Sequence, residues 1–374
     1  MSDDTTIRLR IWETATDGYY LMLHPPGEVD AFEAKLPVSR ETLKSRLQTI
    51  RDSLNRITRS LKTVKLTEEE RDYILHTFAQ EGYDAFADWA GASGQAFDFM
   101  NWVITEFHNA TTINITAKSL SLPWEIMSID AKAESLWGLS YVIQRQLPRN
   151  GVPVTPRTQR IETYTPPKVG LLALDDPGFP AIVEEEIPFF IELSENGDIQ
   201  YTLMDPLDPA ADRDEELTKL REFGALERHI YHFACHVELA PNPARSALVI
   251  TKWFRVSPDD IRRKHIDFKK SPLVVLNACD TAKSNPFHTS DLISNLLRTD
   301  IQGIVAAECQ LPDCFAAAFM KQFYRRLLDG AEIGLALKEA RCHFLRDYNN
   351  PLGLLYSLYQ ISPRWRIVRR LLPA

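Results

Sequence analysis

Two short apolar runs, each followed by a reactive side chain, constrain the fold of this chain more than any other feature. The run Leu273–Leu276 is opened by Pro272, and Cys279 follows it. A second run, Ile230–Cys235, has His236 directly at its carboxyl end. Continuous apolar runs of this length predict strands that are buried on both faces of a mainly parallel sheet. Ligands of such sheets bind beyond the carboxyl ends of the strands, so we expect both reactive residues to face a crevice.

The spacing of the two runs indicates that their strands are neighbours. His236 and Cys279 are 43 positions apart, which leaves room for one hairpin and one helix between them. Adjacent strands lie about 4.8 Å apart, and consecutive elements usually pack together. We therefore expect the two strand ends to point to one place.

The carboxyl-terminal half alternates between predicted strands and predicted helices, which is typical of an α/β domain. Further strands are expected at 169–174, 199–204, 303–307 and 354–360, and helices at 181–193, 215–223, 290–298, 313–328 and 332–346. With a hairpin near 247–250 set apart, this pattern predicts a six-stranded, mainly parallel sheet flanked by helices.

The amino-terminal part has a different pattern, which predicts a mixed α+β domain. Strand-like pieces at 6–13 and 19–24 are followed by helical periodicity at 39–61, 67–89 and 94–109, and Thr67 with Glu70 forms a capping-box pattern. Five prolines fall between residues 148 and 167, which is typical of a linker. We therefore predict an amino-terminal domain (1–147), a linker (148–167) and a carboxyl-terminal domain (168–374).

Composition argues against several classes of protein. A net charge of -8 disfavours a nucleic-acid-binding surface, and no apolar run has the length of a signal peptide or a membrane span. The odd number of cysteines, five, predicts reduced thiols in a cytoplasmic protein. No spacing of ligands predicts a metal site, and no glycine-rich loop follows a strand to hold a nucleotide. A serine hydrolase is disfavoured because the chain lacks a Gly-x-Ser-x-Gly elbow.

Two motifs give the carboxyl-terminal domain a resemblance to a known family. His-Phe-Ala-Cys-His (His232 to His236) and Leu-Asn-Ala-Cys-Asp-Thr (Leu276 to Thr281) resemble the histidine and nucleophile motifs of the CHAT domain. This domain is a mainly prokaryotic branch of the caspase and separase superfamily of cysteine peptidases. Residues 176–186, the late helices, Pro123-Trp124-Glu125 and the segment from Arg145 are also similar to it, so that the resemblance covers about 120–360.

The resemblance implies a caspase-like fold and a cysteine endopeptidase that uses a Cys-His dyad and needs no cofactor. Cys279 would be the nucleophile and His236 the general base, because a free thiol is mostly protonated at neutral pH. The backbone amides of Cys279 and residue 237 would stabilise the oxyanion. The family usually has glycine after the histidine, whereas this chain has Val237.

A second interpretation stays open beside the peptidase. A lone cysteine is most often a small buried hydrophobe and a lone histidine a structural residue, so the chain is alternatively a catalytically silent scaffold that binds a protein partner. The strand alternation predicts that Cys235 points to the face opposite His236 and is inert. His232, which lies inside its strand, has a weaker claim to catalysis than His236.

Substrate recognition is predicted from acidic residues at the strand ends. Asp175, Asp176, Asp280 and Asp313 are the candidate wall of the pocket, which favours cleavage after basic residues. The alternative is that Asp175 and Asp176 form a solvated turn before Pro177. The resemblance further implies a protein substrate and a regulated role in bacterial signalling or antiviral defence. The amino-terminal domain would then receive an activating or recruiting protein partner.

Overall fold

The structure is a computed structural model of the chain. It describes residues 5–14, 18–27, 30–91, 94–106, 110–117, 122–146, 160–163, 165–173, 180–205, 208, 210–238, 247–251, 253–278, 296, 301–360 and 365–369. The side chains of Arg40, His236, Ala278, Arg369 and residues 160–162 are outside this description.

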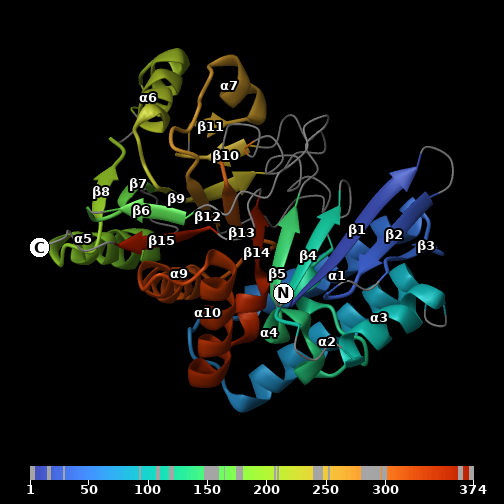
Figure 1. Cartoon of the computed structure of the whole chain (residues 1–374). Helices are drawn as coiled ribbons and strands as arrows, with labels where there is room; N and C mark the ends of the chain where they lie inside the picture. The colour runs from blue at the N-terminus through green and yellow to red at the C-terminus, as the bar shows by residue number, and fades with distance from the viewer. Residues whose placement is uncertain are drawn as a thin grey trace, which may run out of the picture.

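The central feature is one sheet that runs through both halves of the chain (Figure 1). Its strands follow the order β11-β10-β9-β12-β13-β14-β5-β4-β1-β2-β3, and β7 pairs with β9 and with β8. Since β9 has β7 and β12 beside its first part and β10 beside its end, the sheet branches at the strand that carries His236.

The carboxyl-terminal part of this sheet has the six strands that the sequence predicts. In spatial order they are β8 (Gln200–Leu203), β7 (Lys168–Ala173), β9 (Ile230–Glu238), β12 (Leu273–Ala278), β13 (Gly303–Ala307) and β14 (Tyr356–Gln360). All the pairs are parallel except β13 with β14. The expected six-stranded, mainly parallel α/β sheet is therefore confirmed. The hairpin of β10 (Ala247–Val249) and β11 (Arg255–Val256) is not set apart, because β10 pairs with the end of β9.

The amino-terminal part extends the same sheet. Its strands are β5 (Val142–Gln146), β4 (Thr112–Ala117), β1 (Thr6–Thr14), β2 (Gly18–His24) and β3 (Phe32–Lys35). The two parts meet where β14 pairs with β5, at Tyr359 opposite Arg145. Part of the Pro-rich segment forms a strand, β6 (Arg160–Thr163), beside β15 (Arg366–Arg369). The division of the chain at 148–167 stays a prediction.

Most of the predicted helices are present with small shifts at their ends. They are α1 (Arg40–Ser60), α2 (Glu68–Ala90), α3 (Gln95–Glu106), α5 (Ile187–Glu195), α6 (Arg213–Ala225), α9 (Asp313–Leu328) and α10 (Ile333–Tyr348). The chain also forms the short helices α4 (Trp137–Ser140) and α7 (Pro258–Arg263). Short 3-10 turns cover Trp124–Ile126, Ala133–Ser135 and Pro351–Leu355. The capping box of Thr67 and Glu70 is formed. The helix expected at 290–298 lies outside the described residues, except for residue 296.

Helices cover both faces of the carboxyl-terminal part of the sheet, whereas the amino-terminal strands β1, β2 and β4 alternate between buried and more exposed side chains and have α1, α2 and α3 on one side (Figure 1). One core cluster joins buried side chains of α1, α2, α3, α5, α9 and α10 to the sheet and spans both parts of the chain. A smaller cluster on the opposite face is built from α6, α7 and the hairpin. In the described ranges, no helix combines the length and apolarity that crossing a bilayer requires.

Candidate active site

The carboxyl ends of the adjacent strands β7, β9, β12 and β13 lie at one edge of the sheet because these strands are parallel. The final pair between β9 and β12 is Cys235 with Ala278. These two residues directly precede His236 and Cys279 in the sequence. The expectation that the two strands are neighbours with their ends at one level is therefore confirmed.

The predicted catalytic residues themselves are only partly described. The backbone of His236 belongs to β9 and pairs with Val249 of β10, whereas its side chain is outside the description. Cys279 and three of the four predicted pocket residues, Asp175, Asp176 and Asp280, also lie outside the described residues. Their roles stay predictions.

Val237, the predicted oxyanion donor, lies in a regular strand. It pairs with Leu248 of β10, and its side chain is 6% exposed within the smaller core cluster. Among the described residues, the non-glycine positions with a left-handed backbone do not include residue 237. A β-branched residue fits this extended conformation, in which its side chain packs on a neighbouring strand.

Asp313, the remaining predicted pocket residue, begins α9. Its carboxylate accepts a hydrogen bond from the amide of Cys314 at 2.8 Å and is partly exposed. The thiol of Cys314 approaches the carbonyl of Lys62 at 3.6 Å, so the start of α9 touches the segment that follows α1. The amino-terminal part therefore reaches the loop that leaves the carboxyl end of β13.

The other cysteines differ from what a nucleophile requires. Cys235 is fully buried with Tyr231 and Phe233 in the smaller core cluster. Burial, with the negative charge of Glu186, raises the pKa of its thiol to about 12. Burial also raises the pKa of Cys309 to about 12. Both thiols are therefore almost entirely protonated at neutral pH.

A carboxylate inside the core joins the two strands that carry the predicted dyad. Oε2 of Glu186 lies 2.7 Å from Nε2 of His232 on β9, and Oε1 accepts a 2.7 Å hydrogen bond from Nδ2 of Asn277 on β12. His232 is fully buried, and the Glu186 side chain is 4% exposed. Val275, two residues before Asn277, is the register partner of His232, so the carboxylate bridges neighbouring positions on one face.

Two tyrosines complete this cluster. The hydroxyl of Tyr324 on α9 lies 3.0 Å from Nδ1 of His232, and the hydroxyl of Tyr356 on β14 donates to Oδ1 of Asn277 at 2.6 Å. Burial, with the charge of Glu186, raises the pKa of Tyr324 well above its ordinary value. The phenol therefore keeps its proton, and His232 is hydrogen-bonded through both ring nitrogens, Nδ1 to the Tyr324 hydroxyl and Nε2 to the Glu186 carboxylate.

The position of Glu186 depends on a local irregularity. It ends a π-helical segment, Ile182–Glu186, that leads into α5. Pro188, at the start of α5, has no amide proton and interrupts the α-helical bonding there. Glu185 instead forms an ion pair with Lys321 at 2.9 Å, so only the third glutamate of the run points into the core. π-Helical turns occur frequently at functional sites.

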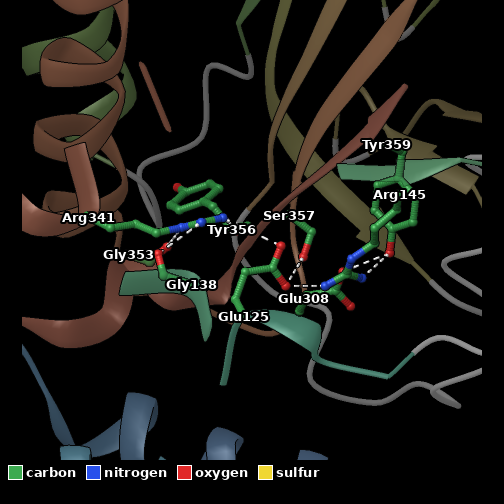
Figure 2. Close-up of polar contacts among 9 residues, drawn as sticks. All are labelled: Glu125, Gly138, Arg145, Glu308, Arg341, Gly353, Tyr356, Ser357 and Tyr359. Atoms are coloured by element: carbon green, nitrogen blue, oxygen red, sulfur yellow. Dashed lines mark hydrogen bonds and ion pairs between the residues drawn. The ribbon is translucent and has the colours of Figure 1, made fainter. Parts of the chain in front are cut away.

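A second buried cluster ties the two parts of the sheet together (Figure 2). Arg145 of β5 is hydrogen-bonded to Glu125, to Glu308 at 2.7 Å and to the hydroxyl of Tyr359 at 2.8 Å. Burial lowers the pKa of Arg145, but the charges of Glu125 and Glu308 more than offset this and raise it overall. Arg341 of α10 lies on the other side of Glu125, with Nη2 3.4 Å from its Oε1.

The Arg145 cluster joins two upstream segments whose only signal in the sequence was their similarity to the CHAT domain. Glu125 belongs to the Pro-Trp-Glu motif, and Arg145 begins the second upstream segment similar to the CHAT domain. Glu308 directly follows β13 at the edge that we assign to catalysis, and the Tyr359 hydroxyl bonds it at 2.7 Å. The segment after β13 is therefore held by the amino-terminal part through buried charges.

The sequence signalled these two clusters only weakly. His232 was recognised within its motif, but Asn277, Tyr324 and Tyr356 carried no sign of their contacts. Glu186 was included only as the last residue of the segment 176–186 that is similar to the family. Within the described ranges, no group of three or more His, Cys, Asp or Glu side chains could hold a metal ion.

Comparisons with known proteins agree with this architecture. The family model described as the CHAT domain matches residues 112–363. A protein named as a probable protease, from Vitiosangium sp. (strain GDMCC 1.1324), is 30% identical over 210 residues, which is 52% of this chain and 26% of that protein. The chain thus spans about a quarter of that relative.

The fold also resembles solved structures. Two crystal structures of the Saccharomyces cerevisiae separase–securin complex superpose with TM-scores of 0.54 and 0.52 at 12% and 10% identity. Each covers 98% of this chain and about 30% of the separase-complex chain. The similarity in fold therefore includes the amino-terminal residues, for which the sequence alone suggested no relative.

Proposed function

This chain belongs to the CHAT domain family, and from that premise we propose that it is a cysteine endopeptidase with nucleophile Cys279 and general base His236. The observation that supports this most strongly is the register of β9 and β12. Cys235 and Ala278 are paired, and each is followed directly by one member of the proposed dyad. The other buried thiols have raised pKa values and a poor capacity for nucleophilic attack.

The proposed chemistry is acyl transfer through a thioester. The imidazole of His236 takes the proton of the Cys279 thiol, and the thiolate attacks the carbonyl carbon of the scissile amide. The amides of Val237 and Cys279 stabilise the oxyanion. The C–N bond then breaks as His236 returns the proton to the leaving amine, and water hydrolyses the thioester. General-base catalysis of this kind contributes about 10²- to 10⁴-fold to the rate.

We further propose that the peptidase is regulated through its amino-terminal part. The Arg145–Glu308 ion pair and the contact of Cys314 with Lys62 place amino-terminal residues against the segment between β13 and α9. A protein partner that binds the amino-terminal part would act on the site through these contacts. Such control fits the role in cytoplasmic bacterial signalling or defence that the family resemblance implies.

The proposed specificity is cleavage after basic residues. Asp175 and Asp176 follow β7, Asp280 follows Cys279, and Asp313 begins α9 beyond β13, so the acids belong to segments at one edge of the sheet. A charge-assisted hydrogen bond from Lys or Arg contributes about 1.5 to 3 kcal/mol of discrimination. Cleavage of a peptide library chiefly after aspartate would end this assignment.

The deciding experiment for the activity compares the wild-type chain with Cys279→Ala. Each protein is incubated with a denatured proteome, and new amino termini are mapped by mass spectrometry. Cleavage sites that require Cys279, and that also disappear with His236→Ala, support the endopeptidase. Identical termini with all three proteins would contradict it.

One observation favours the silent scaffold as the second candidate. β9 continues as a regular strand through Val237, at the position where the family usually has the flexibility of glycine. A scaffold would bind its partner equally well as wild type and as His236→Ala, and neither protein would cleave it.

A further inference from the structure

We propose that Glu186 is a positioning residue for the nucleophile, acting through Asn277. This inference rests on the proposed function, because it assumes that Cys279 and His236 are the dyad. The carboxylate bonds β9 and β12 at the same time, and these are the strands that lead into the two residues. Asn277 precedes Cys279 by only two positions, and His232 precedes His236 by four.

The hydrogen bonds of the cluster converge on one carboxylate. Nδ1 of His232 is hydrogen-bonded to the Tyr324 hydroxyl, and Nε2 of His232 to Oε2 of Glu186. Tyr356 donates to Oδ1 of Asn277, whose Nδ2 donates to Oε1 of Glu186. Both chains of hydrogen bonds end on Glu186. Buried networks in which every partner is satisfied are rigid, so this one holds the two strands in a fixed relation.

Aromatic packing around the cluster also restricts the movement of its side chains. The ring of Tyr356 stacks on Phe319 of α9, with centroids 4.6 Å apart and an interplanar angle of 3°. Phe190 of α5 packs against His232 with centroids 5.1 Å apart. Helices α5 and α9 and strand β14 therefore all contribute to holding Asn277 and His232 in place.

If this cluster only stabilised the core, apolar side chains could take the place of the carboxylate. Well-packed apolar side chains of similar volume often stabilise a core as much as a buried ionised group, so stability alone does not explain a carboxylate here. What the carboxylate adds is a fixed geometry between β9 and β12. A Cys-His pair needs this geometry, because the thiol reacts as thiolate only when the imidazole is within hydrogen-bond reach.

The test measures the reactivity of Cys279 and so needs no substrate. The full-length chain is alkylated with limiting iodoacetamide between pH 5.5 and 9, and the rate at each cysteine is followed by peptide mapping. If Glu186 positions the dyad, Glu186→Ala and Asn277→Ala each raise the pH midpoint of Cys279 alkylation by about one unit. The rate at pH 6.5 then falls about tenfold.

Two further variants separate positioning from stability. In Glu186→Gln, the new amide oxygen can still accept a hydrogen bond from His232. Its NH2 group can donate to Asn277 once the Asn277 side-chain amide flips. We therefore expect this variant to shift the midpoint by less than half as much as Glu186→Ala does. The matched control is Tyr231→Phe, on the opposite face of β9, whose hydroxyl bonds the carbonyls of Phe223, Gly224 and Leu226. It removes buried hydrogen bonds from the same strand and should lower the melting temperature without moving the midpoint.

The double variant Glu186→Ala/Asn277→Ala tests whether the two residues act in series. A midpoint equal to that of the single variants supports transmission through Asn277, whereas additive shifts overturn it. A folded Glu186→Ala protein with the wild-type profile also overturns the proposal. Should Glu186→Ala not fold, Asn277→Ala replaces it, because this change removes the residue through which Glu186 would act. Here too an unshifted profile overturns the proposal.

The same data distinguish this inference from the proposed function. If Cys279 of the wild type reacts no faster than Cys314 or Cys342, the dyad is wrong and there is no nucleophile to position. If Cys279 reacts fastest in the wild type and equally fast in the folded Glu186→Ala protein, the dyad stands and only the role of Glu186 is lost.

Discussion

Replacing Arg145 with methionine should destabilise the whole chain, because this guanidinium is buried where the two parts meet and bonds a carboxylate from each. The Arg145 side chain is 5% exposed, and its two carboxylate partners, Glu125 and Glu308, are 1% and 7% exposed. Methionine keeps much of the side chain's apolar volume but removes the guanidinium that bonds Glu308, whose carboxylate keeps the Tyr359 hydroxyl and the more distant charge of Arg51.

The size of the effect follows from these exposures. Removing one partner of a buried ion pair typically costs about 3–5 kcal/mol, and the lower end applies here because Arg341 stays beside Glu125 and the charge of Arg51 still acts on Glu308. We expect a loss of that size in the free energy of unfolding, measured by urea denaturation with tryptophan fluorescence. Arg262→Met is the matched control, because its ion pair with Asp259 is exposed and should contribute less than about 1 kcal/mol.

A second substitution tests the physical cause. Glu308→Gln in the Arg145→Met background removes a buried charge that has lost its directly bonded cation and should recover part of the loss, although the same substitution destabilises the wild type. If Arg145→Met costs less than about 1 kcal/mol, or if Glu308→Gln brings no recovery, the buried-charge explanation is refuted.

Three further predictions concern stability. Gly82→Ala should destabilise α2 despite the better helix propensity of alanine, because an added Cβ would lie 1.8 Å from the carbonyl oxygen of Ile126; a rise in melting temperature would contradict this. Thr67→Ala should lower the free energy of unfolding by about 1 kcal/mol through loss of the capping box, and an unchanged urea midpoint would count against it. In the folded protein the thiols of Cys235 and Cys309 have pKa values of about 12, above the ordinary 9.0, so their contribution to the free energy of unfolding is present below pH 9 and is lost as the pH rises. Between pH 8 and 10 the wild type should therefore lose about 1 kcal/mol more of this free energy than the variant with alanine at either cysteine. The same pH dependence in the wild type and the variant would contradict this.

The sequence predicted the elements whose signal is local. Continuous apolar runs located the strands β9, β12 and β13, and the cap at Thr67 located the start of α2. Strand alternation predicts that Cys235 and His236 point to opposite faces, because side chains along a strand alternate between its two faces. These features depend on neighbours in the sequence, and no knowledge of the tertiary fold was needed to find them.

The features that the sequence did not predict depend on distant contacts. Nothing local in β5 or β14 indicates that Arg145 and Tyr359 pair and make one sheet of the two parts. Which of three consecutive glutamates points inward depends on the π-helical turn before Pro188, and helical periodicity alone does not locate such a turn. Sequence patterns thus identified the strands that lead to the proposed dyad but missed the residues that join those strands through buried hydrogen bonds.

The most direct test of the central claim is the pH dependence of Cys279 alkylation in the wild type and in His236→Ala. A nucleophile activated by an imidazole should be labelled before the other cysteines at neutral pH. In His236→Ala, the midpoint of its alkylation should rise toward the value of a free thiol, about 8.5. Preferential labelling of Cys235 or Cys309, or a midpoint that is the same in both proteins, would contradict the assignment of Cys279 and His236 as a catalytic dyad.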